Sequence, residues 1–238
     1  MASQFGILSK LEFLQNWSSQ IIAAINPAMI HNIEKYYVLK KVHYLSAIED
    51  VAGDYLEFGV FTGSSFCHSI RCNQKLGYLS SSVMTTKFFG FDSFCGFGEI
   101  SDKDQHSFYT DKNFETDLRK VERRVQKVAK NTIFKLVPGF FSDTLSLGPS
   151  SLGIEKARII FVDSDTYSSS SEALTFCEDI VQLGTFIVLD DFYSYKGSNA
   201  KGVTKAFDEF IENTGIKVRK VFIYGMGGAV FVVSDVKI

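Results

Sequence analysis

The sequences R-I-I-F-V-D-S-D-T-Y, residues 158–167, and G-T-F-I-V-L-D-D-F-Y, residues 184–193, decide the fold of this chain. Each begins as an unbroken apolar run rich in β-branched and aromatic residues. Such a run is typical of a strand that is buried on both faces of a parallel sheet. We therefore expect two buried strands here.

Both runs break into carboxylates, so these acids are expected at the carboxyl ends of the two strands, where open α/β sheets bind their ligands. If the strands are neighbours, about 4.8 Å apart, their acids can converge on one divalent cation. The acids are Asp163 and Asp165 after the first run, and Asp190 and Asp191 after the second.

Length and composition indicate a soluble protein with a large core. The chain has 238 residues, of which 23 are Phe, and its net charge is −2. No basic surface for nucleic acid or anionic lipid is indicated, and no apolar run of about 18 residues predicts a membrane-spanning helix. The N-terminus lacks a secretory signal pattern, and the scattered cysteines form no C-x-x-C pair. We therefore expect a cytoplasmic protein with reduced thiols.

Residues 1–52 are expected to form a helical segment before the first strand. Ser9 and Glu12 match a capping box that predicts a helix to about Ile25. Asn26 and Pro27 then predict the start of a second helix that continues to about residue 51. These helices could form a lid over the sheet, a homodimer surface or both, and plain core packing is an equal alternative.

Residues 53–238 alternate between strand and helix patterns, which predicts a doubly wound, mostly parallel α/β sheet with right-handed crossovers. The G-M-G-G connection at residues 225–228 predicts that the last two strands form an antiparallel hairpin. A seven-stranded Rossmann-like sheet closed in this way is typical of class I S-adenosylmethionine-dependent methyltransferases. The expected helices after the first strand are residues 64–72, 113–130, a weak 146–152, 169–183 with Gly184 as its stop, and 203–213.

The first strand runs into the turn E-F-G-V-F-T-G, residues 57–63, whose glycines allow close approach of a ligand to the backbone. Its pattern differs from the G-x-G-x-x-G of NAD enzymes, and an acid beside the turn suits the ammonium group of S-adenosylmethionine. A tight connection without a ligand is an equal alternative. The candidate cofactor-binding residues here are Glu57, Gly59, Gly63, and Ser64 and Ser65 at the start of the next helix.

Asp92 ends the second strand, where an acid can accept hydrogen bonds from both hydroxyls of a ribose. Capping of the loop by Asp92 is the alternative. The segment after the third strand, residues 139–143, could border the adenine ring. The additional candidate cofactor-binding residues are Ser93, Gly139, Phe140, Asp143 and Asp163.

Four carboxylates at two adjacent strand ends repel one another unless a cation or a proton lies among them. Oxygen ligands favour Mg²⁺ over zinc, so we predict that Asp163, Asp190 and Asp191 bind Mg²⁺. Asp165 is the candidate base, and His106 is a candidate second base on the loop after Asp92. Capping of the following helices is the alternative role for the acids.

Six motifs, taken together and in order, resemble those of the macrocin O-methyltransferase family, which comprises metal-dependent enzymes that methylate sugar hydroxyls of natural products. The motifs are Y-L-E-F-G-V-F-T-G-S-S, F-G-F-D-S-F-C-G-F, P-G-F-F-S-D-T-L, V-D-S-D-T-Y-S-S-S-S-E-A-L, L-D-D-F-Y and K-G-V-T-K-A-F-D-E-F. The resemblance extends from about Asp54 to the C-terminus. It implies an enzyme that uses S-adenosylmethionine and Mg²⁺ on a small sugar or glycoside acceptor, with the site residues named above.

Two regions depart from the family pattern, namely the N-terminal segment and the loop C-G-F-G-E-I-S-D-K-D-Q-H at residues 95–106. Both would shape the acceptor pocket, so the acceptor is not identified by the resemblance. Two other functions are kept as alternatives. One is a dinucleotide- or sugar-nucleotide-dependent oxidoreductase, which the missing G-x-G-x-x-G disfavours. The other is a non-catalytic cofactor-binding relative, which the intact set of carboxylates disfavours.

Overall fold

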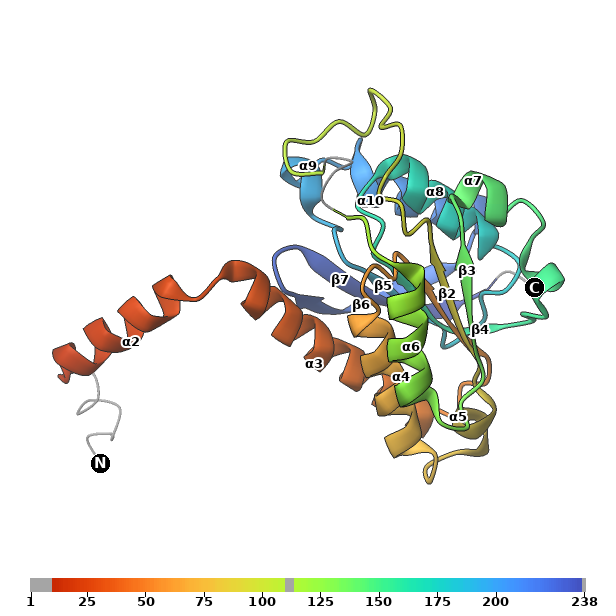
Figure 1. The fold of residues 1–238 in the computed structure, drawn as a ribbon, viewed down its shortest axis with the longest axis horizontal. Helices are drawn as coiled ribbons and strands as arrows, with labels where there is room; N and C mark the ends of the chain where they lie inside the picture. The colour runs from red at the N-terminus through yellow and green to blue at the C-terminus, as the bar shows by residue number, and fades with distance from the viewer. Residues whose placement is uncertain (1–9, 110–113, 237–238) are drawn as a thin grey trace.

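The computed structural model describes residues 10–109 and 114–236, which form a single sheet with helices on both faces (Figure 1). The strand order is β3-β2-β1-β4-β5-β7-β6, with β1 to β5 parallel and β7 antiparallel to both of its neighbours. The predicted class I methyltransferase sheet with its C-terminal hairpin is confirmed. The strands are β1 Asp54–Phe58, β2 Phe88–Asp92, β3 Phe134–Pro138, β4 Ala157–Val162, β5 Phe186–Leu189, β6 Lys217–Tyr224 and β7 Gly228–Asp235.

Strand register brings the predicted site residues to one edge of the sheet. Phe58 of β1 pairs with Val162 of β4, and Val162 pairs with Leu189 of β5. The next residue of each strand, Gly59, Asp163 or Asp190, therefore lies at the same carboxyl edge. The two strands of the acidic motifs are neighbours, as the sequence predicts.

Two apolar clusters join the sheet to its helices. One lies against α3, α4 and α6 and includes Phe66 and Val125, whereas the other lies against α8 and α10 and includes Leu174 and Phe207. Burial of β4 at all six positions agrees with a sheet covered on both faces. The helices are α2 Glu12–Ala24, α3 Pro27–Ile48, α4 Ser64–Leu76, α5 Ser81–Thr85, α6 Leu118–Ala129, α7 Phe141–Thr144, the 3₁₀ helix η2 Pro149–Leu152, α8 Tyr167–Phe176, α9 Ser194–Gly197 and α10 Gly202–Thr214.

The guanidinium group of Arg158 joins α3 to the sheet. Arg158 is fully buried at the start of β4, and its Nε donates to the hydroxyl of Ser46 on α3 at 2.9 Å. Its Nη1 donates to Asn73 of α4 and to Thr86, and its Nη2 donates to a carbonyl oxygen of α3. Because a buried donor without a partner is costly, these bonds fix α3 against the body of the protein.

Several helix boundaries differ from the sequence-based expectation. The first helix begins at Glu12 after Leu11, which makes no side-chain cap, while Ser9 of the expected capping box lies outside the described residues. The predicted cap by Asn26 is confirmed, since its side chain accepts a hydrogen bond from the Ala28 N–H.

The helix expected at residues 169–183 is shorter than predicted. It ends at Phe176, and Gly184 is not its stop. The physical reason is a backbone bond from the Ala157 N–H to the Ile180 carbonyl, which draws the chain away from the helix toward the start of β4. The helix expected at residues 113–130 begins at Leu118, because the side chain of Asp117 caps it through the Arg119 N–H. Helices α5, α7 and α9 have no counterpart in the expected set.

Candidate functional site

Three carboxylates meet at the carboxyl ends of β4 and β5. Oxygen atoms of Asp163, Asp165 and Asp191 all lie within 4.8 Å of one another. Asp165 has a φ of 62°, a left-handed conformation that is uncommon for a residue other than glycine. Burial, together with the charge of Asp191, raises the pKa of Asp165 well above its usual value. This group of oxygen donors fits the preferences of a hard divalent cation such as Mg²⁺.

Asp190 faces a different set of partners. Its Oδ2 lies 2.6 Å from Nζ of Lys35 and 3.1 Å from Nε2 of His31, and its Oδ1 accepts a 2.6 Å hydrogen bond from the hydroxyl of Tyr224. Burial alone would raise the pKa of Asp190, but Lys35 and His31 outweigh burial and hold that pKa well below the usual value. Asp190 is therefore ionised and paired with groups of the protein.

Lys35 extends from α3 into the acidic edge of the sheet. Its Nζ also donates to Asp163 at 2.9 Å, and the residue is only 8% exposed. Burial lowers the pKa of Lys35, but the charges of Asp163 and Asp190 outweigh it and raise that pKa well above the usual value. One ammonium group thus pairs with two of the four acids, Asp163 and Asp190.

Helix α3 also contacts the turn between β6 and β7. Glu34 accepts a hydrogen bond from the Gly225 N–H at 2.6 Å, and Nδ1 of His31 accepts one from the Met226 N–H at 3.1 Å. Gly225 has a φ of 56°, and a Cβ atom there would lie 2.3 Å from Nδ1 of His31. The helix and the hairpin turn are therefore fitted closely together beside Asp190.

The predicted cofactor turn is compact at the end of β1. Glu57 is fully buried and accepts hydrogen bonds from Tyr55 and, at 2.6 Å, from Ser65. Burial raises the pKa of Glu57 to about 7. At Gly59 a Cβ atom would lie 1.9 Å from the carbonyl oxygen of Asp163, so only glycine allows this approach of β1 to β4. Gly63 has a φ of 76° and precedes Ser64, the first residue of α4.

Asp92 lies at the end of β2 and is bonded to the backbone around it. One of its oxygens accepts a 2.6 Å hydrogen bond from the Phe61 N–H, and the other accepts one of the same length from the Phe94 N–H. The adjacent Ser93 donates to the carbonyl oxygen of Gly96. Asp92 thus caps its loop in this structure, and its remaining lone pairs stay available to a ribose.

The adenine candidates follow β3. The Gly139 N–H donates to the carbonyl oxygen of Asp92, so this segment lies beside the end of β2. The Phe140 side chain is 42% exposed, and its ring approaches Gly98 so closely that a Cβ atom there would lie 2.9 Å from it. Asp143 lies in the short helix α7 and is exposed.

The loop after β2 reaches the acidic group through a tyrosine. Tyr109 donates from its hydroxyl to Asp191 at 2.8 Å. The ring of His106 stacks on Tyr109 with centroids 4.4 Å apart and lies 4.9 Å from the ring of Tyr195. Nδ1 of His106 accepts a hydrogen bond from the Phe108 N–H. His106 therefore supports Tyr109, and the structure places Tyr109 between His106 and Asp191.

Sequence reasoning missed Lys35, His31, Tyr109 and Tyr224. Lys35 alone had a visible signal, because it shares the buried face of α3 with Val38, Leu39 and Val42 at helical spacing. A lysine within such an apolar stripe indicates a buried partner of opposite charge.

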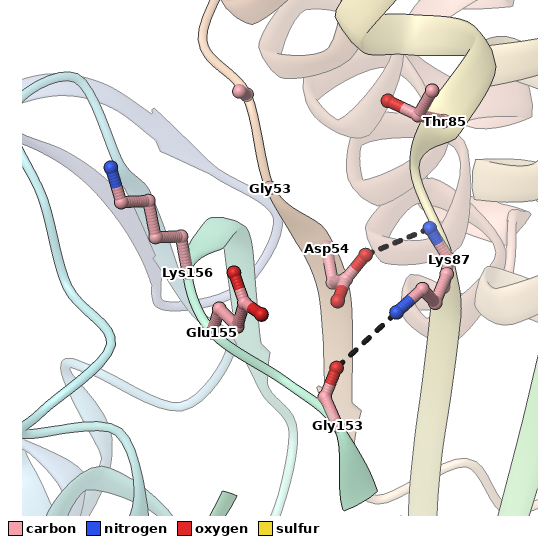
Figure 2. Close-up of a pocket in the computed structure, with 8 residues that line it drawn as sticks. Gly53, Asp54, Thr85, Lys87, Gly153, Glu155 and Lys156 are labelled. Atoms are coloured by element: carbon pink, nitrogen blue, oxygen red, sulfur yellow. Dashed lines mark hydrogen bonds between the residues drawn. The ribbon is translucent and has the colours of Figure 1, made fainter. Parts of the chain in front are cut away.

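A pocket lies at the opposite end of the strands (Figure 2). Asp54 at the start of β1 accepts a hydrogen bond from the Lys87 N–H at 2.9 Å, and Lys87 Nζ donates to the carbonyl oxygen of Gly153. Glu155 and Lys156 also line this pocket. It contains none of the predicted site residues, so the carboxyl edge remains the candidate site.

Solved methyltransferase structures have a similar fold. The O-methyltransferase NovP superposes with a TM-score of 0.63 at 20% sequence identity over 82% of this chain and 79% of that one. The calicheamicin methyltransferase CalS11 gives a TM-score of 0.65 at 15% identity over 83% of this chain and 77% of that one. At these identities the likeness shows the fold.

A curated relative is the mycinamicin III 3''-O-methyltransferase of Micromonospora griseorubida, which is 28% identical over 158 residues. The match covers 62% of this chain and 58% of that enzyme, so the chain aligns with little more than half of its relative. Within the described residues, no helix has the length and apolarity needed to cross a membrane.

The family profile of macrocin-O-methyltransferase (TylF) matches residues 27–227, which contain every candidate site residue. The chain belongs to the macrocin-O-methyltransferase (TylF) family.

Proposed function

We propose that this protein is a Mg²⁺-dependent O-methyltransferase that transfers a methyl group from S-adenosylmethionine to a hydroxyl of a sugar or glycoside. The observation that carries the proposal is the group of Asp163, Asp165 and Asp191 beside the glycine turn of β1, in a chain of this family. Bound S-adenosylmethionine would supply the electrophilic methyl group. The side chains described here would position the acceptor, and positioning is a large part of catalysis in such a transfer.

The cofactor would bind along the ends of β1, β2 and β3. Glu57 is suited to the ammonium group because it is a buried carboxyl at the glycine turn. Gly59 lets β1 approach β4, and Gly63, with a φ of 76°, makes the turn into α4. Ser64 and Ser65 begin α4, whose first N–H groups have no partner within the helix. Asp92 would accept bonds from the ribose, with Ser93 beside it and Gly139, Phe140 and Asp143 along the adenine.

Mg²⁺ would bind at Asp163 and Asp191, which belong both to the set predicted from sequence and to the group that converges in the structure. The third ligand predicted from sequence is Asp190, whose oxygens are paired with Lys35, His31 and Tyr224. We therefore propose Asp165 as an alternative third ligand, because its oxygen lies within 4.8 Å of those of Asp163 and Asp191.

Asp165 is also the proposed base. Its raised pKa means that its carboxylate binds a proton more readily than an exposed aspartate, which suits removal of a proton from a hydroxyl. The side chain of Asp165, whose backbone φ is 62°, lies within 4.8 Å of a carboxylate oxygen of Asp191. His106 would contribute through Tyr109, which it contacts.

The sugar acceptor is proposed from the relatives. One acts on mycinamicin III, and a structure similar in fold is of a TDP-rhamnose 3'-O-methyltransferase. A cytoplasmic location, the absence of nucleic-acid and membrane partners, and a lid role for residues 1–52 remain predictions. The alternative of a dinucleotide-dependent oxidoreductase is disfavoured because Gly59 and Gly63 do not fit its fingerprint.

Titration calorimetry with S-adenosylmethionine, S-adenosylhomocysteine and NAD, each with and without Mg²⁺, tests the proposal. We expect S-adenosylmethionine and S-adenosylhomocysteine to bind and NAD not to bind. Saturation by NAD alone would reverse the assignment. Asp190→Asn should abolish Mg²⁺ binding and leave cofactor binding intact if Asp190 is a ligand. If Asp165 is the third ligand in place of Asp190, Asp165→Asn should abolish Mg²⁺ binding and leave cofactor binding intact. Asp208→Asn, on α10 away from the site, is the matched control.

A further inference from the structure

Helix α2 extends away from the body of the protein (Figure 1), and none of its residues is buried. It nevertheless carries large apolar side chains, and Phe13, Trp17 and Ile22 are 60–68% exposed. A 13-residue helix whose apolar side chains stay exposed is only marginally stable in water, because most helical stability in proteins comes from packing of an apolar face. The described residues bury no side chain of α2, so we look for a further surface that could cover its apolar side chains.

Helix α3 presents a matching surface on its outer side. Its inner face, including Leu39 and Val42, is in the core. Its outer face carries an apolar stripe at helical spacing, formed by Met29, Ile33, Tyr37, Tyr44 and Ile48, which are 48–61% exposed. From Met29 to Ile48 this stripe is about 29 Å long, and α2 is about 20 Å long, so one helix can lie within the length of the other.

We propose that two copies of this chain pair through these helices, with each α2 packing on the apolar stripe of the other copy's α3. One two-fold axis would cover both surfaces in both copies, because an isologous interface uses the same patches twice. The two-residue connection Ile25–Asn26 between the helices directs α2 outward from its own α3 (Figure 1). The pairing does not depend on the proposed catalytic function.

The exposed apolar area is sufficient for a stable dimer. Three aromatic side chains, Phe13, Trp17 and Tyr37, are 61–68% exposed. Together these three side chains expose roughly 300–500 Å² of surface. A standard interface buries about 800 Å² on each partner. The rest of the area is available from the remaining apolar side chains of both helices, which are Leu14, Ile21, Ile22, Met29, Ile33, Tyr44 and Ile48.

The charge of α2 favours a second copy over a lipid surface. Helices that lie on membranes are rich in Lys and Arg on their polar face. Between Glu12 and Ala24, α2 contains a single charged residue, which is Glu12 itself, and no Lys or Arg. Its polar residues are Gln, Asn and Ser, which suit the rim of a protein interface.

Sedimentation equilibrium of the full chain at about 1–100 µM tests the pairing in the range of typical dimer affinities. The wild type should be a dimer. Trp17→Lys and Ile33→Glu should each raise the dissociation constant about 100-fold or more, because the two-fold axis places each new charge in the interface twice. Leu147→Glu, at a 77% exposed position between α7 and η2, should leave the dissociation constant unchanged. A monomeric wild type, or a dimer that tolerates both substitutions, would overturn the pairing.

Mixing the two variants tests the α2-on-α3 arrangement. In a mixed dimer, Lys at residue 17 of one copy would face Glu at residue 33 of the other, while the second contact stays native. The mixture should therefore form a dimer that neither variant forms alone. No dimer in the mixture would overturn this arrangement. Flotation of the wild type with vesicles of equal parts phosphatidylcholine and phosphatidylglycerol, lost in Trp17→Lys, would overturn the assignment of a second copy.

Discussion

Removal of the Lys35 ammonium group by Lys35→Met should destabilise the protein strongly. The substitution leaves the carboxylates of Asp163 and Asp190, whose side chains are 20% and 5% exposed, without the cation that lies 2.9 Å and 2.6 Å from them. Breaking a buried ion pair from one side costs about 3–5 kcal/mol. For a domain of this size each kcal/mol lowers Tm by about 2–4 °C, so Tm should fall by about 6–20 °C.

Both pH and Mg²⁺ should change the stability that Lys35→Met loses, each in a defined direction. Burial and the charge of Asp190 raise the pKa of Asp163, and Lys35 opposes this rise. Removal of Lys35 should therefore raise the pKa of Asp163 further. The unfolded variant ionises Asp163 at lower pH than the folded variant does, so the stability lost through the substitution should grow as pH rises and shrink as pH falls. Mg²⁺ should restore part of Tm, because a cation bound to the native state stabilises it by mass action.

Differential scanning calorimetry of wild type and Lys35→Met, with Mg²⁺ and with a chelator, measures these effects. Lys120→Met is the matched control, since Lys120 is exposed on α6, and its Tm should equal that of the wild type. A Tm of Lys35→Met within about 2 °C of the wild type in chelator would refute the reasoning, because it would mean a loss of less than about 1 kcal/mol.

Three further predictions concern the cofactor turn and the base. Because burial raises the pKa of Glu57 to about 7, S-adenosylmethionine binding near that pH should release a proton as its ammonium favours the carboxylate. The calorimetric heat should then vary with the ionisation enthalpy of the buffer, and Glu57→Gln should remove this variation. Asp165→Asn should lower kcat about 10²–10⁴-fold with an unchanged cofactor dissociation constant, and a kcat near wild type would exclude its role as base. Gly59→Ala should lower the free energy of unfolding, measured with urea, by about 1–3 kcal/mol more than Gly148→Ala does. Both glycines have positive φ, but a Cβ atom at Gly148 meets nothing within 4 Å.

The fold was predictable because its signals are local and repeated. Apolar runs such as residues 159–162 identify buried strands, and the glycines at residues 225–228 identify the hairpin. Each of these segments has one pattern that fits one kind of element, so the doubly wound sheet and its closing hairpin could be predicted. Helix ends such as Phe176 were missed because a long-range bond, from Ala157 to Ile180, decides where the chain leaves the helix.

The site was predictable only where its residues end strands. Asp163 and Asp191 belong to conspicuous motifs, and the register of β4 with β5 brings them together. Lys35 and Tyr109 come from a helix and a loop that are distant in sequence. The apolar stripe around Lys35 indicates a buried acidic partner, but no local pattern identifies which carboxylates Lys35 and Tyr109 contact. Pairing of Asp190 with Lys35 could not be anticipated without the position of α3.

Formation of S-adenosylhomocysteine from S-adenosylmethionine tests the central claim most directly. The wild-type protein would be incubated with macrocin, mycinamicin III or TDP-rhamnose as acceptor probes, in Mg²⁺ and in excess chelator. We predict acceptor-dependent formation of S-adenosylhomocysteine that stops in chelator and returns when Mg²⁺ is restored. Undiminished turnover in chelator would contradict the account.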